Sequence, residues 1–339
     1  MISTIKGQVR ELWKLCFDDS DEFMDLYFRT RYNSTTSMYI ESGSSVISSL
    51  QILPYSFTYY NADLKAYYIS GACTHPEYRN KGVMRGLLKE CLAKLSSEGA
   101  VFSFIIPAED WLFDYYAKFG FASVFSYGLQ DVTENKMRCN SSKIERVPDF
   151  QKDVYKFFNV KMHKRDFCIQ HSEEDLKVVC EDMKIDDGSI FAAYREGNIV
   201  GEAFVYEFDD KLQIAELLAD TNKVKQELIQ AVREMNPQTK VELISPATDN
   251  GESVRHGMIR VINAPKAIQL YAAHHPNLIM NIELNDEFLS SNNNYYYLYK
   301  GKCMVTKEKL PGKLFHFNMT ELSQFLFKGL HPFMSLMMD

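Results

Sequence analysis

Three basic side chains surround a glycine at the point where a strand pattern gives way to a helix pattern. Arg79, Lys81 and Arg85 flank Gly82, and the apolar positions that follow recur on one helix face. The first turn of a helix presents unpaired backbone N–H groups and the positive end of the helix dipole. A glycine lets that backbone approach a ligand closely. The stretch therefore predicts a diphosphate site, with a basic surface loop before a core helix as the alternative.

The elements around this loop follow a mixed order. Helix patterns fill residues 5–31, and β-branched and aromatic runs predict strands at 36–41, 45–60 and 64–73. A helix over 83–95, a strand over 101–106, a helix over 109–118 and a strand over 121–131 come next. This succession predicts an α/β (α+β) domain in which helices pack on a central mixed, mostly antiparallel sheet.

The loop also carries a family resemblance. Arg79-Asn80-Lys81-Gly82-Val83 resembles the acetyl-CoA loop of the GNAT superfamily, the Gcn5-related N-acetyltransferases, and the element order is that of a GNAT fold. Met84 replaces the small residue that ends the superfamily pattern. Arg85, one position later, is similar to the Eis-like branch (enhanced intracellular survival protein and its bacterial relatives), which tolerates a larger residue there.

The resemblance implies acetyl-CoA as the cosubstrate. The backbone of Ala72, Cys73 and Thr74 is then expected to pair with the pantetheine arm, and N–H groups from Lys81 to Arg85 are expected to hold the diphosphate. The expected cofactor-binding residues are Ala72, Cys73, Thr74, Arg79, Asn80, Lys81, Gly82, Val83, Met84 and Arg85. A covalent acyl-Cys73 is disfavoured, because GNAT transfer is direct and no His or Lys is placed to activate the thiol.

Tyr116 is the expected general acid. In GNAT enzymes a tyrosine four residues before the glycine of a Gly-Phe pair, here Gly120-Phe121, protonates the CoA sulfur. A phenol, with a pKa near ~10, is able to supply that proton. Tyr115 points elsewhere on the helix. The alternative is that both tyrosines are packing residues.

The end of the sequence supplies an expected base. In the Eis-like branch the terminal carboxylate folds back into the active site, and this sequence ends at Asp339 after the apolar run 333–338. Burial of that run would draw Asp339 inward to accept a proton from the ammonium group of the acceptor. Which of its two carboxylates acts stays open, and a tail that packs on the surface or on an oligomer partner is the alternative.

Two substrate contacts are expected between the N-terminal helices. Phe17 and Asp19 match positions that line the amine pocket of Eis-like enzymes. Helix capping within the acidic cluster 18–22 explains the same residues without a substrate role.

The resemblance extends over three predicted domains. Residues 1–135 form the N-terminal GNAT acetyltransferase domain. Residues 136–250 form a second, degenerate GNAT-like domain, because no glycine loop follows its strand at 214–219. Residues 251–339 resemble a sterol-carrier-like C-terminal α+β domain that ends in the active site.

Composition excludes several classes of function. Asp and Glu outnumber Lys and Arg by 45 to 38, which argues against a nucleic-acid partner. The seven cysteines form no C-x-x-C pair, and the histidines form no ligand set, so neither a disulfide framework nor a metal is expected. No apolar stretch has the length of a signal peptide or a membrane span, so a cytoplasmic protein without a membrane partner is expected.

The sequence therefore predicts an acetyl-CoA-dependent N-acetyltransferase. An amine of a small acceptor is expected to attack the thioester directly, and the net charge of −7 is compatible with a cationic acceptor. The branch tends to form trimers or hexamers, so a homo-oligomer is expected. The alternative is a catalytically silent CoA- or lipid-binding scaffold, and no motif identifies the acceptor or the acyl preference.

Overall fold

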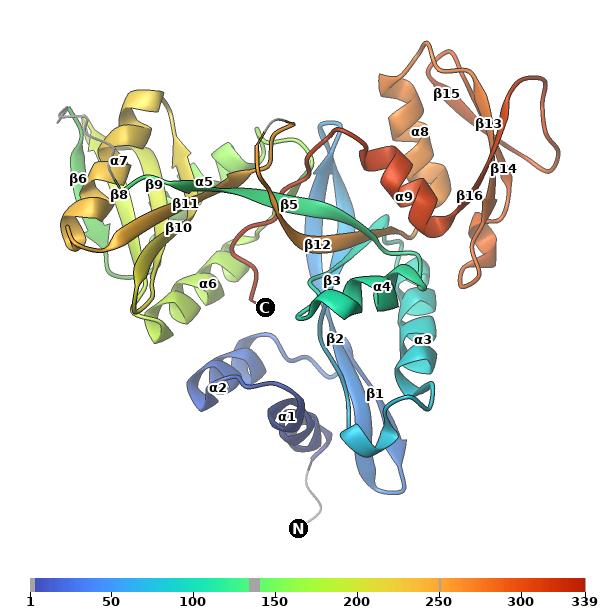
Figure 1. Cartoon of the computed structure of the whole chain (residues 1–339), viewed down its shortest axis with the longest axis horizontal. Coiled ribbons are helices and arrows are strands. Elements are labelled where there is room, and N and C mark those ends of the chain that lie inside the picture. The colour runs from blue at the N-terminus through green and yellow to red at the C-terminus, as the bar shows by residue number, and fades with distance from the viewer. Residues whose placement is uncertain (1–3, 134–140, 250, 339) are drawn as a thin grey trace. The chain divides into compact units, whose positions relative to one another are not determined.

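The computed structural model describes residues 4–133, 141–249 and 251–338, which group into two compact units (Figure 1). The first unit contains the chain up to Phe125 and the stretch His256–Leu330. The second unit contains Ser126–Arg255 and His331–Met338. Each unit is thus built from stretches that lie far apart in the sequence. The predicted division at residues 135 and 250 stays a prediction.

The first unit opens with the predicted succession of helices and strands. Its elements are α1 (Ile5–Cys16), α2 (Asp21–Thr30), β1 (Ser37–Ser42), β2 (Ser45–Tyr59), β3 (Ala62–Thr74), η1 (Pro76–Tyr78), α3 (Val83–Ser97), β4 (Phe102–Ile105) and α4 (Asp110–Ala117). Ser20 caps α2, because its side chain accepts a hydrogen bond from the amide of Phe23 at 3.1 Å. The short polar turn between α1 and α2 is thereby fixed.

The sheet of this unit is mixed, as predicted. β1, β2 and β3 pair antiparallel, β3 and β4 pair parallel, and β12 (Val254–Val261) adds to β4 in antiparallel register. Helix α3 covers one face of β1–β3 and α1 covers the other (Figure 1). Five apolar side chains of α3 enter the core from their face: Leu87, Leu88, Cys91, Leu92 and Leu95.

Helix α1 approaches β3 so closely that only a glycine fits beneath it. A Cβ atom at Gly71 would lie 2.0 Å from Cζ3 of the Trp13 ring, and Gly71 has φ +57°. Both the space and the left-handed backbone therefore require glycine. This close approach sets the position of the end of α1 beside the end of β3.

The later part of the first unit is a small α/β layer. Helices α8 (Ala264–His274) and α9 (Met319–Phe327) pack against a four-stranded sheet in the order β15-β14-β13-β16 (Figure 1). Its remaining elements are β13 (Met280–Asn285), η2 (Ser290–Asn292), β14 (Tyr295–Tyr299), β15 (Lys302–Thr306) and β16 (Leu314–Asn318). The predicted resemblance of this layer to a sterol carrier stays a prediction.

A buried arginine joins this layer to the loop after α4. Arg260 is 0% exposed and donates from Nε to the carbonyl of Phe119 at 2.6 Å. Its Nη2 donates to Oδ1 of Asp286 at 2.7 Å, which compensates the buried charge. The backbone around Tyr116 is therefore held by residues from more than a hundred positions away.

The second unit contains a similar core order to the first, in which two helices precede three strands, a helix and a further strand. It holds β5 (Ala122–Asp131, entered from the first unit), β6 (Lys143–Val147), α5 (Lys152–Met162), β7 (Cys168–Gln170), α6 (Glu173–Ile185), β8 (Ser189–Arg195), β9 (Asn198–Glu207), β10 (Lys211–Ala219), α7 (Asn222–Met235) and β11 (Lys240–Pro246). β8, β9 and β10 pair antiparallel and β10 and β11 pair parallel, as β1 to β4 do.

Helices cover both faces of this second sheet (Figure 1). Phe158 of α5 and Leu176 of α6 enter one core, and Leu228 of α7 enters the other. β8 and β9 form a hairpin about Glu196 and Gly197, both of which have positive φ.

Every helix among the described residues is too short or too polar to cross a lipid bilayer.

Candidate active site

The first unit contains a cavity of about 810 Å³. Its walls come from the end of α1, the end of β3, the loop and first turn of α3, and the segment around α4. The lining residues are 16–18, 72–74, 78–80, 82–85, 108–109, 111–112, 115–116 and 118–119. A cavity of this size is in the range of small-molecule and cofactor sites.

Helix α3 starts in this cavity without a side-chain cap. Its N-cap residue Gly82 lies in the left-handed region with φ 78° and ψ 5°, and Asn80 also has a positive φ. A Cβ atom added at Gly82 would meet nothing within 4 Å, so the backbone faces open space. The amides of the first turn and the positive end of the helix dipole are thereby available to an anionic ligand.

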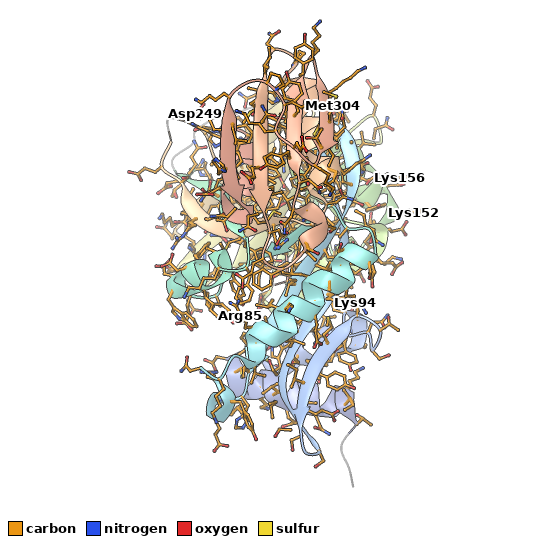
Figure 2. The ribbon with its side chains drawn as sticks, turned by 90° about the vertical axis from the view of Figure 1, so that its right-hand side faces the viewer. Arg85, Lys94, Lys152, Lys156, Asp249 and Met304 are labelled. Atoms are coloured by element: carbon orange, nitrogen blue, oxygen red, sulfur yellow. The ribbon has the colours of Figure 1, made fainter. Side chains whose placement is uncertain are left out.

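The three basic residues of the loop have different surroundings. Arg79 lines the cavity and donates from Nε to the carbonyl of Thr74 at 3.1 Å. Arg85 lies on the first turn of α3 (Figure 2), where its guanidinium pairs with Glu287 and lies 5.4 Å from the ring centre of Phe288. Lys81 is not among the lining residues. The charge of Arg85 is therefore already partly compensated.

The end of β3 forms the opposite wall. Ala72, Cys73 and Thr74 all line the cavity. On one edge β3 pairs with β2 as far as Thr74, but β4 pairs with its other edge only over Ala66–Tyr68. The second edge of β3 thus runs past the end of β4 at the cavity, where an extended ligand arm is able to lie beside it.

Tyr116 contributes the predicted phenol. It lines the cavity, its side chain is 5% exposed, and burial raises its pKa, with smaller contributions from Tyr115 and Cys73. The phenol therefore keeps its proton at neutral pH and is a donor rather than a base. Tyr115 lines the same cavity but is only half-buried.

Of the two predicted substrate residues, only Phe17 lines the cavity. The carboxylate of Asp19 accepts a 2.6 Å hydrogen bond from Nε1 of Trp13. The lining carboxylates are instead Asp18 and Glu109. Sequence reasoning did not place Asp18 there, because the acidic turn holds several carboxylates and no pattern distinguishes the inward one.

The predicted base, Asp339, lies outside the described residues. The segment 331–338 before it belongs to the second unit, where Oγ of Ser335 donates to Glu216 at 2.7 Å. Arg165 donates to both oxygens of Glu216, at 2.7 and 3.0 Å. An apolar run that looked loose in sequence is thus held by a buried polar cluster.

The helix of the second unit that matches α3, α7, starts with a side-chain cap. The side chain of Thr221, the N-cap of α7, accepts a hydrogen bond from the amide of Val224 at 3.3 Å. At the start of α7 the threonine side chain thus caps an amide, whereas at the start of α3 Gly82 has no side chain to do so. The prediction that no glycine loop serves the second unit agrees with this cap.

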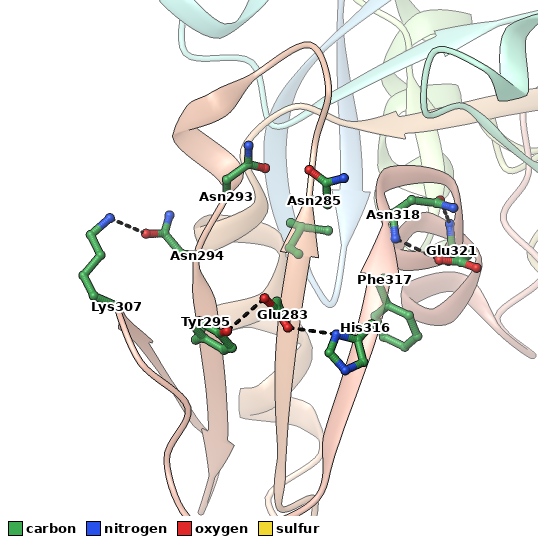
Figure 3. Close-up of a pocket in the computed structure, with 11 residues that line it drawn as sticks. Glu283, Asn285, Asn293, Asn294, Tyr295, Lys307, His316, Phe317, Asn318 and Glu321 are labelled. Carbon is green, nitrogen blue, oxygen red and sulfur yellow. Dashed lines mark hydrogen bonds and ion pairs between the residues drawn. The ribbon is translucent and has the colours of Figure 1, made fainter.

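A second hollow of about 760 Å³ lies in the C-terminal layer of the first unit (Figure 3). Its polar side chains pair with one another: Glu283 accepts from Tyr295 and His316, each at 2.8 Å. Asn318 and Glu321 close the start of α9 with a reciprocal capping box. Glu283, Tyr295, His316, Asn318 and Glu321 are thus paired within the protein.

Comparison with known proteins gives a family for the first part of the chain. Residues 6–124 match the family model described as "Acetyltransferase (GNAT) domain". A comparison with curated proteins found no match.

Solved structures share the fold over nearly the whole chain. A probable N-acyltransferase from Enterococcus faecalis has a TM-score of 0.77 at 15% identity, covering 95% of this chain and 87% of that one. A GCN5-related N-acetyltransferase from Anabaena variabilis has a TM-score of 0.78 at 16% identity, with coverages of 97% and 89%. Eis1 from Mycobacterium abscessus has a TM-score of 0.71 at 9% identity, with coverages of 95% and 87%.

Proposed function

Because residues 6–124 form a GNAT acetyltransferase domain, as the loop predicted, we propose that this protein is an acetyl-CoA-dependent N-acetyltransferase acting on a primary amine of a small acceptor. One observation carries the proposal. A helix start without a side-chain cap, at Gly82, opens into the same cavity as the buried phenol of Tyr116. Donors for a diphosphate and a proton source for a leaving thiolate thus share one space.

Each wall of the cavity receives a role. The amides of the first turn of α3 hold the diphosphate, and Arg79 adds positive charge beside it. The second edge of β3 at 72–74 receives the pantetheine arm, which brings the thioester toward Tyr116. Holding both reactants in one cavity converts a bimolecular reaction into an effectively unimolecular one.

The transfer itself is a direct displacement. The amine nitrogen attacks the thioester carbonyl, the C–N bond forms, and the C–S bond breaks. The leaving thiolate takes the proton of Tyr116, and the proton of the former amine goes to a base. The carboxylate of Asp339 stays the predicted base, and solvent reprotonates the phenolate between turnovers.

The cavity favours a cationic acceptor. Asp18 and Glu109 contribute carboxylates to the cavity lining. Glu109 is also held in place, because Nε1 of Trp111 donates to it at 2.8 Å. An ammonium-bearing acceptor is attracted by these two charges, whereas a carboxylate-bearing acceptor is repelled.

A thiol-release assay tests the function. The full chain is incubated with acetyl-CoA and a panel of diamines, polyamines, amino sugars and amino acids, and free CoA is measured with a thiol reagent. The expected result is amine-dependent thiol release together with an acetylated acceptor in the mass spectrum. Acetyl-CoA without amine is the control for hydrolysis. Tight acetyl-CoA binding with no release across the panel would favour the silent scaffold instead.

A further inference from the structure

Two thiols that the transfer reaction does not use lie in the wall of the same cavity. Cys16 ends α1 and is partly exposed, whereas Cys73 lies near the end of β3 and is 6% exposed. The close approach of α1 to β3 over Gly71 places these two chain ends side by side. The two cysteines are 57 positions apart in sequence, so no local motif predicts that they are neighbours.

Cys16 lies beside a cation that favours its thiolate. Nη2 of Arg79 donates to the sulfur at 3.8 Å, and the protonated thiol donates to the carbonyl oxygen of Thr74 at 3.6 Å. The neighbouring Cys73 and the Arg79 guanidinium lower the pKa of Cys16 to about 6, although burial opposes them. A partly exposed thiolate beside an arginine is the form in which a cysteine reacts with oxidants.

Cys73 is held in the opposite protonation state. The neighbouring Cys16 and burial raise its pKa well above the ordinary value. The hydroxyl of Ser49 lies 3.6 Å from its sulfur, on the side of β2. Near neutral pH the pair therefore contains one thiolate and one thiol, which is the arrangement of an attacking and a resolving cysteine.

We propose that Cys16 and Cys73 are a redox-modification site, in which a hydroperoxide oxidises the pair to a disulfide that closes the acetyl-CoA cavity. The formation of the disulfide stands on the two thiols alone. Its effect on acetyl-CoA binding rests on the function proposed above.

The chemistry balances with hydrogen peroxide as the oxidant. The Cys16 thiolate attacks one peroxide oxygen, the O–O bond breaks, and hydroxide leaves, which gives a sulfenic acid. The Cys73 thiol then attacks that sulfur, the S–S bond forms, and the hydroxyl leaves with the thiol proton as water. Two equivalents of a small thiol reduce the disulfide and are themselves oxidised.

Closing the bond changes the cavity. Disulfide sulfurs lie about 2 Å apart, so the bond fixes the end of α1 to the end of β3 at the wall expected to receive the pantetheine arm. Arg79 also loses the thiolate beside it. Both changes oppose acetyl-CoA binding, by about tenfold or more.

Peptide mapping after oxidation tests the modification. The full chain is treated with hydrogen peroxide, free thiols are alkylated under denaturing conditions, and peptides are identified without reduction. A Cys16–Cys73 cross-linked peptide that disappears with dithiothreitol is expected. Cys16→Ser abolishes it, and Cys303→Ser, a partly exposed cysteine elsewhere in the first unit, leaves it unchanged. Cys16 recovered as a sulfinic acid, with Cys73 free, would overturn the proposal.

Calorimetry separates this proposal from the proposed function. Acetyl-CoA is titrated into the reduced and the oxidised protein, with Cys16→Ser as a variant that oxidation leaves unaffected. Binding that is lost by about tenfold or more only in the oxidised wild type supports closure. A cross-linked protein that binds acetyl-CoA as the reduced one does contradicts closure. No binding by the reduced protein contradicts the proposed function and leaves the disulfide mapping valid.

Discussion

At the scale of single residues, the proposed chemistry depends on Tyr116. Its phenol is buried and keeps its proton, whereas the phenol of Tyr115 is only half-buried on the same short helix. The two neighbours therefore give a matched pair of variants, since each loses one hydroxyl from the same cavity.

We predict that Tyr116→Phe lowers kcat for amine acetylation by about 10²–10⁴-fold, the range of general acid catalysis, with little change in acetyl-CoA affinity. Tyr115→Phe is expected to keep kcat within about threefold. Steady-state kinetics at saturating acetyl-CoA measure both. Equal activity of the two variants would remove the acid role from Tyr116.

A second residue, Glu202 of β9, affects stability through pH. It is 0% exposed, and among the described residues neither carboxyl oxygen has a hydrogen-bond partner. Burial raises its pKa well above the ordinary value. The folded state therefore holds a proton that the unfolded chain releases above about pH 4.3, so stability falls as pH rises from there toward the folded pKa.

We predict that Glu202→Gln removes this decline. Its stability relative to the wild type grows with pH, by up to about 1.4 kcal/mol per pH unit within the window. Urea unfolding at a series of pH values measures the difference. Glu207→Gln, at the exposed end of the same strand, is the control and should run parallel to the wild type. A constant offset for Glu202→Gln would contradict the prediction.

Which site residues the sequence predicts follows from how local their signals are. The motif Arg79–Arg85 lies within seven consecutive positions at one expected helix start, so the sequence alone is enough to predict a diphosphate site there. Arg85 forms an ion pair with Glu287, which lies 202 positions away, and no pattern in either segment predicts this pair. Cys16 and Asp18 reach the cavity only because α1 packs against Gly71, which is a tertiary contact.

At the scale of elements, the contact between α1 and β3 positions one wall of the cavity. Gly71 has the Trp13 ring directly over it, whereas Gly43, in the turn between β1 and β2, has φ +62° and open space around its Cβ direction. Both glycines have a left-handed backbone conformation, but only Gly71 is packed against another side chain.

We predict that Gly71→Ala destabilises the protein by about 1–3 kcal/mol more than Gly43→Ala, because overpacking adds to a similar backbone strain. Thermal unfolding of both variants measures this. Gly71→Ala also weakens acetyl-CoA binding, since it displaces the end of α1. Equal destabilisation by the two alanines would show that Trp13 moves aside freely.

The segment 331–338 is an element of another kind, held without helix or long strand. The amide of Phe333 donates to the carbonyl of Phe167 at 2.9 Å, and Ser335 donates to the buried carboxylate of Glu216. A hydrogen bond to a charged acceptor contributes about 1.5–3 kcal/mol, so Ser335 is the main polar anchor.

We predict that Ser335→Ala raises hydrogen exchange at the amides of 331–338 by about tenfold or more. His331 lies in the same segment and makes a partly exposed contact with Asp249. His331→Ala removes that contact and is expected to leave hydrogen exchange nearly unchanged. Exchange measured by mass spectrometry resolves the segment. Unchanged exchange in Ser335→Ala would assign the anchoring to apolar packing alone.

At the scale of the whole molecule, the first unit combines stretches that lie far apart in the sequence. The stretch His256–Leu330 groups with the first part of the chain, and β12 pairs with β4. Which strand pairs with β12 depends on which strand edges are free in the folded sheet. The alternation of polar and apolar residues within a strand does not specify that partner. The predicted trimer or hexamer stays a prediction.

The two units of the molecule also differ in what their matching helix starts offer. Gly82 leaves the start of α3 open, and Thr221 caps the start of α7. We therefore expect one acetyl-CoA for each chain, bound by the first unit.

Calorimetric titration of acetyl-CoA into the wild type, Gly82→Ala and Gly197→Ala tests this most directly. Both glycines have φ +78° with nothing within 4 Å of the added Cβ, so the substitutions are matched in strain, but only Gly82 lines the cavity. The wild type and Gly197→Ala should bind one acetyl-CoA per chain with equal affinity, and Gly82→Ala should bind about tenfold or more weakly. An unchanged affinity in Gly82→Ala would contradict a diphosphate site at this turn.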